Sequence, residues 1–397
     1  MEIDYANGIV ARAGDAGPWF TEACAAAGIR IVPRDFTPPS TAGLWPGIRH
    51  PPSVKGRGDE VTSASREPWV DANGYLAAWL RALHPDRAPL LGYLPDRAAG
   101  LEPDRAVPFD TLELALIEAW AAGGNYLLSL EPRYQAALSR GEEKAKEAWT
   151  SLVRTSRWLR DNIRLFRTAP FDTVTALVES GEETAEIANL LYRRNASPAL
   201  ARADRPPAPS AARRALVAAN IRPPSPEARA RMLANAESGS TLVVAPPAGT
   251  GASANWWSGS SNAARLKLVR SEADRDFYSL GRGQVVAYQR PVNDPSEFAL
   301  DVIDIVAHRN RAVRLWNAPA VVALAAKGAA PGQAIMHLVN YGSPVDSEIQ
   351  ARIQGSYRKG QLIRPEGAPI ELKPAGRGTT TEVMVPELRR LGVVVFG

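Results

Sequence analysis

The stretch that decides the fold is "GGNYLLSLEP", residues Gly123 to Pro132. Two glycines follow an alanine-rich helical segment, and an apolar run without polar alternation, Tyr126 to Leu130, comes after them. A run that is apolar on both faces is typical of a parallel strand covered by helices. Glycine permits a tight turn out of a helix and lets two backbones approach closely. The stretch therefore predicts a buried parallel strand that stops at the step from Glu131 to Pro132.

Outward from this stretch, residues 1–168 alternate short apolar runs with helical segments, which is typical of βα units and a parallel sheet. Long loops rich in Pro and Gly, such as "TPPSTAGLWPGIRHPPSVKGRG" (37–58), follow the strand ends, where α/β enzymes build their sites. The pattern predicts strands at 2–5, 29–33, 60–64, 89–94 and 125–130, and helices at 17–27, 73–83, 111–121 and 142–163.

Two further regions follow along the chain. Residues 169–312 contain the apolar runs "DTVTALVES", "RRALVAANI" and "STLVVAP" separated by helical segments, which predicts a small doubly wound α/β domain. Residues 313–397 change to period-two runs separated by Gly and Pro turns, which predicts an antiparallel β-sandwich. The fold class is thus multidomain α/β plus all-β.

Composition excludes several classes of function. The chain has 397 residues, of which 45% are hydrophobic and 22% charged, and no apolar run approaches the roughly 20 residues of a membrane span. Because Cys24 is the only cysteine, disulfides within the chain are excluded. The net charge of +5 is small and the arginines are scattered, which disfavours a nucleic-acid groove. Four histidines lie far apart, so we expect no zinc site, and the start "MEIDYANGIV" lacks a secretory signal, which indicates the cytoplasm.

Several segments resemble glycoside hydrolases. "GGNYLLSLEP", followed by a helix ending in "SRWLRDN", resembles the last strand and helix of (β/α)8 barrels of the α-L-fucosidase type. "TLVVAPP", "LGRGQVVAY" and "LVNYGSP" are similar to segments of glycoside hydrolase family 42 β-galactosidases, and the resemblance covers nearly the whole chain. It implies a (β/α)8 TIM barrel, then a flavodoxin- or amidotransferase-like trimerisation domain, then a β-sandwich. The middle domain lacks a nucleophile-elbow cysteine, so we expect no amidotransferase chemistry there.

Length conflicts with a complete barrel. A (β/α)8 barrel takes roughly 250 residues, whereas residues 1–168 hold five predicted βα units. We therefore expect Met1 to lie within barrel strand four, and the chain to be the C-terminal portion of a longer glycosidase. An intact protein with a half-barrel is the alternative.

Glycoside hydrolysis needs two carboxyl groups across the scissile bond. By resemblance, Asp4 in "EIDYANG" is the predicted nucleophile or base, and Glu60 in "GRGDEVTSASREPW" is the predicted general acid, with Asp59 as its substitute. The alternatives are a carboxylate that caps the next helix for the first, and a solvated glutamate or partner of a nearby arginine for the second. Asp35 is predicted to pair with Arg34 rather than to act on substrate.

A sugar subsite needs aromatic platforms and short polar groups. Trp45, His50, Trp69 and Tyr93 occur in or beside the predicted loops at strand ends and are our candidates for substrate binding, with packing as the alternative for each. Trp120 and Trp158 fall at helical positions and are predicted core residues. The adjacent pair Trp256 and Trp257, in "ANWWSGSSN", is interpreted as an oligomer contact.

The sequence thus predicts a glycoside hydrolase-like protein that acts on an oligosaccharide or glycoside with two carboxylates, without cofactor or metal, and that forms a homo-oligomer through its middle domain. The alternative is a non-catalytic carbohydrate-binding or assembly protein on the same scaffold. A regulatory small-molecule binder is disfavoured, because no glycine-rich nucleotide fingerprint follows the first strand of the middle domain.

Overall fold

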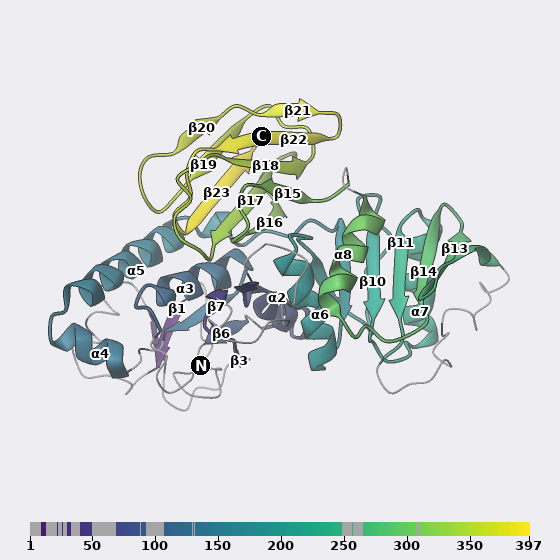
Figure 1. Cartoon of the computed structure of the whole chain (residues 1–397), viewed down its shortest axis with the longest axis horizontal. Coiled ribbons are helices and arrows are strands. Elements are labelled where there is room, and N and C mark those ends of the chain that lie inside the picture. Colours follow the sequence, from purple (N-terminus) through teal and green to yellow (C-terminus); the bar gives the residue numbers. More distant parts are fainter. Residues whose placement is uncertain are drawn as a thin grey trace, which may run out of the picture.

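The computed structural model has three regions (Figure 1): an α/β region, a second α/β region beside it, and a two-sheet β region that lies over both. The structure describes residues 9–12, 22, 26, 30–32, 40–49, 69–87, 89–92, 107–128, 130, 132–247, 256, 265–307 and 310–397. A mixed α/β chain with several sheets, as predicted, is confirmed.

The first region is built on five parallel strands. They are β1 (Ile9–Arg12), β2 (Arg30–Val32), β3 (Ser40–Ala42), β6 (Leu90–Gly92) and β7 (Asn125–Leu128), in the order β2-β1-β7-β6-β3. The strands predicted at 29–33, 89–94 and 125–130 are confirmed; those predicted at 2–5 and 60–64 lie outside the described residues.

The strand order of this sheet differs from our expectation. Five consecutive barrel strands would place the first strand at the edge furthest from β7, whereas β1 pairs directly with β7. The first and last strands of a barrel meet in this way. Within the described residues β2 and β3 form the two edges of the sheet, so the closed eight-stranded barrel stays a prediction.

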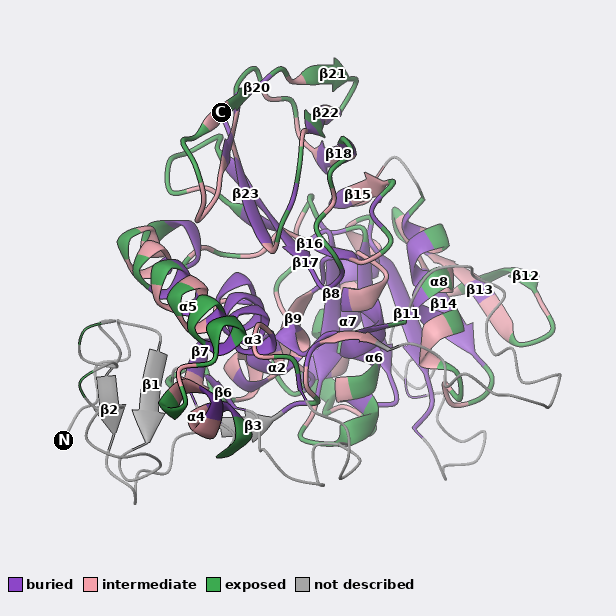
Figure 2. Ribbon diagram, turned by 60° about the vertical axis from the view of Figure 1, so that its left-hand side comes forward, coloured by how far each residue is buried: buried purple, intermediate pink, exposed green. Residues whose placement is uncertain are grey.

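Helices cover this sheet, and a small hairpin precedes them. The helices are α2 (Gly74–Leu83), α3 (Thr111–Ala121), α4 (Pro132–Ser139) and α5 (Glu143–Asp161), followed by the 3-10 turn η3 (Ile163–Leu165); the antiparallel hairpin consists of β4 (Gly47–Arg49) and β5 (Trp69–Asp71). The helices predicted at 73–83, 111–121 and 142–163 are confirmed, whereas the one at 17–27 lies largely outside the described residues. Helix α3 is buried along its whole length (Figure 2), and Trp120 within it is fully buried as predicted.

The structure explains the two glycines that precede β7. Gly123 has φ +75°, the left-handed conformation that commonly ends a helix, and a Cβ on it would lie 2.1 Å from Nη1 of Arg81. A Cβ on Gly124 would lie 2.6 Å from the Cβ of Ala77 in α2. Both positions therefore require glycine, because α2 passes directly against the turn.

Two arginines close the end of α3. Arg81 and Arg167 both donate to the carbonyl oxygen of Gly123, at 3.3 and 2.8 Å. Arg167 also donates to Oδ1 of the buried Asn125 at 2.8 Å, and the amide nitrogen of Asn125 donates to the carbonyl of Pro89 at 3.1 Å. Cations near a helix C-terminus are favourable, so this corner stabilises both the helix end and the start of β7.

The middle region is a seven-stranded sheet with helices on both faces. Its parallel strands are β8 (Val174–Val178), β9 (Ala199–Arg202), β10 (Ala215–Ala219), β11 (Thr241–Ala245) and β14 (Gly283–Tyr288), and its helices are α6 (Glu182–Arg193), α7 (Pro226–Glu237) and α8 (Pro295–Val306). The parallel order β9-β8-β10-β11-β14 is the 2-1-3-4-5 order of flavodoxin-like sheets. Two antiparallel strands that we did not predict, β12 (Lys267–Ser271) and β13 (Arg275–Leu280), extend the sheet beyond β14.

The third region consists of two antiparallel sheets that share one apolar core. One sheet has the order β15-β18-β22-β21 and the other β16-β17-β23-β19-β20. Their strands are β15 (Val313–Trp316), β16 (Val321–Lys327), β17 (Ala334–Asn340), β18 (Ile349–Gln354), β19 (Gly360–Ile363), β20 (Ile370–Leu372), β21 (Ala375–Arg377), β22 (Thr380–Val385) and β23 (Leu391–Phe396).

The three regions meet at the edge strand β16. Asn195 and Ser197, between α6 and β9, have φ of 56° and 48° and point their side chains at this edge. Asn195 accepts from the N–H of Ala323 at 2.7 Å and donates to the carbonyl of Val321 at 3.2 Å; Ser197 accepts from the N–H of Ala325 at 2.8 Å. Side chains of the middle region thus satisfy an edge that would otherwise be open to another strand.

A buried histidine lies at the same junction. His337 in β17 is 2% exposed, stacks on Phe166 at 5.0 Å, and places Nε2 2.9 Å from the carbonyl oxygen of Leu165. Burial lowers the pKa of His337 to about 4, so the ring is neutral and donates from Nε2. Its Nδ1 is buried without a hydrogen-bond partner among the described residues.

The interpretation of Trp256 as an oligomer contact was wrong. This side chain is 7% exposed and packs in the core between α7 and the middle sheet. Trp257 lies outside the described residues.

Of the helices in the described part of the chain, none combines the length and apolar character that spanning a membrane requires.

Candidate functional site

The predicted site residues divide into two groups. Asp4, Asp35, His50, Asp59, Glu60 and Tyr93 lie outside the described residues, so their proposed roles stay predictions. Trp45 and Trp69 are described. Trp45 follows the carboxyl end of β3, the side of a parallel sheet on which α/β proteins place their sites, and Trp69 begins β5 in the separate β4-β5 hairpin.

Trp69 forms a cluster with Asp71 and Arg193, here called the Trp69 cluster. The indole Nε1 donates to Oδ1 of Asp71 at 3.1 Å, and the guanidinium carbon of Arg193 lies 4.3 Å from the ring centroid. Arg193 also forms an ion pair with Asp71 at 3.3 Å, and these two side chains are only 10% and 13% exposed. Trp69 itself is 41% exposed, so a surface of the ring stays accessible for a ligand.

Trp45 has a different environment. It follows β3 by three residues and is half-buried against the core of the first region. The next strand, β4, touches the third region, because a Cβ on Gly342 would lie 3.0 Å from the side chain of Ile48. Trp45 is held by packing. Of the two tryptophans, Trp69 has the larger exposed surface.

A buried carboxylate fixes the loop after β3. Asn73 exchanges two hydrogen bonds with the backbone of Leu44, at 3.0 and 2.7 Å. Glu118 in α3 accepts from the backbone N–H of Asn73 at 2.8 Å, from its side-chain amide at 3.0 Å, and from the hydroxyl of Tyr341 at 2.8 Å. Burial and the charge of Glu118 raise the pKa of Tyr341 well above its ordinary value. This network joins the first region to the third.

The sequence analysis did not single out Glu118, Asn73 or Tyr341, although one signal was present. The helix "TLELALIEAWA" carries two glutamates in an otherwise apolar segment, and both Glu113 and Glu118 are buried. A charged residue inside an apolar helix requires a polar partner. Glu113 finds it in Thr155, whose hydroxyl donates at 2.5 Å.

Both described carboxylates beside the predicted aromatic residues are therefore engaged internally. Asp71 is paired with Arg193, and Glu118 accepts three hydrogen bonds in the core. A buried carboxylate with satisfied hydrogen bonds is suited to holding elements together. A catalytic carboxyl pair on this side of the sheet would have to come from other residues.

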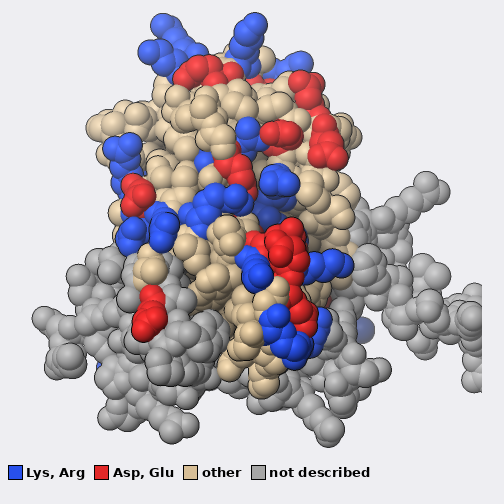
Figure 3. Space-filling model, turned by 90° about the vertical axis from the view of Figure 1, so that its left-hand side faces the viewer, with Lys and Arg blue, Asp and Glu red and all other residues tan. Residues whose placement is uncertain are grey.

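A groove of about 540 Å³ lies between the first and third regions; we call it the junction groove. The groove lies beside the start of α3 and beside α4 and α5. Charges of both signs are intermingled on this side of the molecule (Figure 3). Arg390 forms an ion pair with Asp110 across it. Its lining residues are Pro108, Phe109, Asp110, Glu113, Arg133, Lys144, Glu147, Ala148, Ser151, Pro344, Glu366, Arg389 and Arg390.

The aromatic residue in this groove is not free to stack on a ligand. Phe109 lies parallel to Tyr134 with ring centroids 4.6 Å apart, and the guanidinium carbon of Arg133 lies 4.9 Å from the Phe109 centroid. Lys144 and Arg389 have no ion-pair partner among the described residues, and carboxylates such as Glu147 line the same groove, so it offers charges of both signs rather than an aromatic platform.

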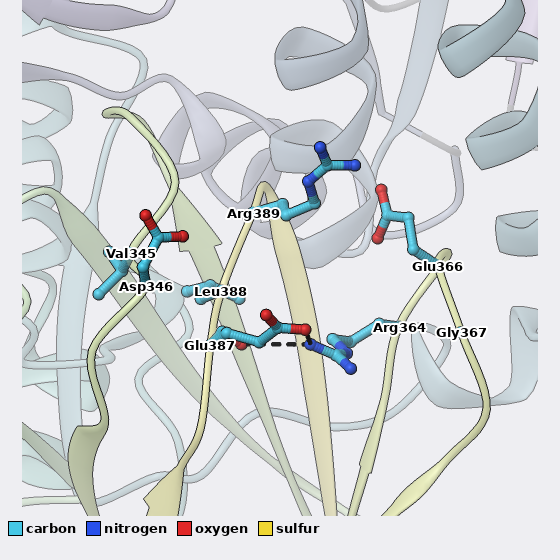
Figure 4. A pocket seen from close by; sticks show the side chains of 8 residues that line it. All are labelled: Val345, Asp346, Arg364, Glu366, Gly367, Glu387, Leu388 and Arg389. Carbon is cyan, nitrogen blue, oxygen red and sulfur yellow. Dashed lines mark hydrogen bonds and ion pairs between the residues drawn. The ribbon is translucent and has the colours of Figure 1, made fainter.

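A second pocket, of about 440 Å³, opens on the third region (Figure 4). Arg364 and Glu387 are paired across it at 2.7 Å. Glu366 and Arg389 line both this pocket and the junction groove. In the described part of the chain no group of three His, Cys, Asp or Glu side chains is arranged to hold a metal ion.

Comparison with known proteins supports the fold but no particular family. No family model matches the sequence, and no curated protein is similar to it by sequence. An α-L-fucosidase, isoenzyme 2 from Paenibacillus thiaminolyticus, matches with a TM-score of 0.52 at 12% identity, over 81% of this chain and 62% of that one. A β-galactosidase from Bacillus circulans sp. alkalophilus matches with a TM-score of 0.54 at 12% identity, over 82% and 57%.

The chain has a glycoside hydrolase-like fold. The predicted resemblance is confirmed at this level, while the finer prediction that the chain is the C-terminal portion of a family 42 protein stays a prediction. The chain spans about three fifths of the length of these solved chains.

Proposed function

We propose that this chain is part of a protein that hydrolyses O-glycosidic bonds on the carboxyl side of the β2-β1-β7-β6-β3 sheet. The observation that carries this proposal is the fold likeness to an α-L-fucosidase and a β-galactosidase over more than four fifths of the chain. The mechanism would be the general one for glycosidases, with one carboxyl that protonates the leaving oxygen and one that acts as nucleophile or base.

The residues proposed for this chemistry are Asp4 as nucleophile or base and Glu60 as general acid. Asp71 and Glu118 are not part of the proposal, because their oxygens are already engaged inside the protein. The exposed surface of Trp69 would support a sugar ring, and Trp45, His50 and Tyr93 are the other residues proposed for substrate binding. This chemistry requires neither cofactor nor metal.

Hydrolysis of a panel of nitrophenyl glycosides, including β-galactoside, α-fucoside and α-rhamnoside, tests the proposal. Asp4→Asn and Glu60→Gln should each lower kcat on the active substrate by about 100- to 10,000-fold. Asp346→Asn, a carboxylate in the pocket of the third region, is the matched control and should leave kcat unchanged. Hydrolysis that survives both variants would assign the reaction to other carboxyls.

A second candidate is carbohydrate binding without hydrolysis on the same scaffold. It is favoured by the engagement of Asp71, which is paired with Arg193 and accepts from the indole of Trp69, so that among the described residues this carboxylate is not available for catalysis. Saturable binding of a neutral glycoside, with loss of binding in Trp69→Ala and no product in the wild type, would favour this candidate.

We further propose that copies associate through the middle region. The edge strand β12 exposes Leu268 by 58% and Val269 by 65%, and an exposed apolar edge strand favours pairing with another chain. Light scattering should find an oligomer for the wild type and a smaller species for Val269→Asp. A monomeric wild type would contradict this proposal.

A further inference from the structure

The outer face of the β15-β18-β22-β21 sheet carries an unusual set of side chains. Strand β15 turns Val313 inward and leaves Arg314 and Trp316 half-exposed. In β18 the buried residues alternate in the same way with outward ones, among them Arg352. The strand register places Arg314 directly opposite Arg352. Two like charges in direct cross-strand contact are destabilising, so their presence on one face needs an explanation.

Both guanidinium groups gather over one indole ring. The guanidinium carbon of Arg314 lies 4.6 Å from the centroid of Trp316, and that of Arg352 lies 5.4 Å from it. Arg311, just before β15, adds a third cation, and its side chain is only 18% exposed. We call Arg311, Arg314, Arg352 and Trp316 the arginine face.

Two arginines of this face, Arg311 and Arg314, have no close carboxylate among the described residues. Arg311 reaches only Asp304, at 3.9 Å, and the side chain of Asp304 is 71% exposed. The Nε atom of Arg311 is buried without a hydrogen-bond partner among the described residues. No carboxylate in the described part of the chain forms an ion pair with Arg314.

Glu382 lies opposite Arg352 on β22, but it is shared. Its Oε2 accepts from Arg377 at 2.8 Å and from Gln350 at 3.3 Å. Burial lowers the pKa of both Arg311 and Arg352, and the nearby charge of Arg314 lowers it further, while Asp304 and Glu382 act in the opposite direction. An anion between these arginines would relieve the crowding.

We propose that the arginine face binds a saccharide that bears a carboxylate or sulfate group, with the anion between Arg314 and Arg352 and the sugar ring against Trp316. Guanidinium groups form paired hydrogen bonds with planar anions, and an indole ring packs against the apolar face of a sugar. The requirement for an anion rests on the arginines alone, while the choice of a saccharide rests on the function proposed above.

Affinity electrophoresis of the full chain through gels with four probes tests this proposal: polygalacturonate, dextran sulfate, neutral dextran and a single-stranded oligothymidylate. The wild type should be retarded by polygalacturonate, by dextran sulfate or by both, and not by dextran. Retardation by polygalacturonate alone would identify a carboxylate ligand, and retardation by dextran sulfate alone a sulfate ligand. Arg314→Gln and Arg352→Gln should each weaken the retarding interaction at least about tenfold.

Arg270→Gln is the matched control. Arg270 also stacks on an aromatic ring, that of Phe277 at 3.8 Å, but it is paired with Glu272 at 3.2 Å. Its variant should bind like the wild type, and Arg314→Lys, which keeps the charge without the paired donors, should bind with intermediate strength.

Equal retardation by dextran, or unchanged binding in both glutamine variants, would overturn the proposal. Tighter binding of the oligothymidylate than of either acidic polysaccharide would also overturn it, because the face would then bind nucleic acid. A chain that hydrolyses nothing but still binds the acidic probe would remove the hydrolytic function and leave the arginine face in place.

Discussion

Trp69 and Trp316 each have arginine over the indole ring, and the two sites differ in how those arginines are paired. In the Trp69 cluster one guanidinium stacks on the indole and is paired with Asp71, whose oxygen also accepts from the indole N–H. On the arginine face two guanidiniums gather over Trp316, and Arg314 has no paired carboxylate among the described residues.

This difference in pairing indicates a structural role for the Trp69 cluster and is the basis of the binding role proposed for the arginine face. The Trp69 cluster holds the β4-β5 hairpin against α6 of the middle region, and its charges are matched and mostly buried. The arginine face is partly exposed on the outside of a sheet, and Arg314 within it forms no ion pair with a carboxylate of the described residues. The matched stack joins two regions, whereas the face that contains Arg314 is the one proposed to bind a ligand.

The largest loss of stability is expected when the ion pair of the Trp69 cluster is removed. Asp71→Asn deprives the buried Arg193 of its ion pair and should lower the free energy of unfolding by about 3 kcal/mol. Urea denaturation followed by tryptophan fluorescence measures this change. Asp204→Asn is the control, because its pair with Arg202 is exposed and should cost less than about 1 kcal/mol. Equal costs for the two variants would show that the Trp69 cluster is not a joint.

Acid pH tests the buried junction at His337 without changing the charge of the two arginine clusters. Arginine stays charged throughout the acid range, so neither cluster titrates there. The folded state keeps His337 neutral down to a pKa of about 4, whereas the unfolded chain protonates it near its ordinary value of 6.5. Protons therefore favour the unfolded chain, and stability present above pH 6.5 is lost as the pH falls toward 4. The loss from this group should be about 3 kcal/mol.

His337→Gln keeps a donor for the carbonyl of Leu165 but does not titrate. Its free energy of unfolding should fall less steeply than that of the wild type between pH 6.5 and 4. Parallel pH profiles for the two proteins would contradict the role given to His337.

A smaller loss of stability is expected at the end of α3, where Arg81 and Arg167 donate to a backbone carbonyl rather than to a carboxylate. Gly123→Ala places a Cβ in the left-handed conformation and against Nη1 of Arg81, which should cost about 1–2 kcal/mol. Thermal unfolding measures the loss, with Gly332→Ala as the control, since Gly332 has φ +77° and open space around it. A larger loss at Gly123 than at Gly332 would measure the contact with Arg81, and equal losses would show that it contributes nothing.

The sequence alone predicted the elements with clear periodicity and clear boundaries. Helix α3 begins at Thr111 and ends at Ala121 as predicted, because Gly123 and Gly124 mark its end. Strand β12 was missed because all of its residues are exposed, so no apolar pattern marks it. Strand β9 was also missed, because all four of its residues are half-buried and no alternation of buried and exposed residues marks it.

The site was harder to predict than the fold, because its contacts join distant parts of the chain. Trp69 was predicted from its position near the strand ends, but Asp71 and Arg193 are 122 residues apart and nothing local links them. Glu118 and Tyr341 are 223 residues apart. Trp256 looked like a surface residue because it lies in a Gly- and Ser-rich segment, although its side chain is buried.

Double-mutant cycles at both clusters, measured by urea denaturation at low ionic strength and without added anions, test the central contrast most directly. The account predicts a favourable coupling energy between Asp71 and Arg193, and an unfavourable one of about 0.5 kcal/mol between Arg314 and Arg352. A favourable coupling between Arg314 and Arg352 would contradict the account, because those arginines would then be as well matched as the pair at Trp69.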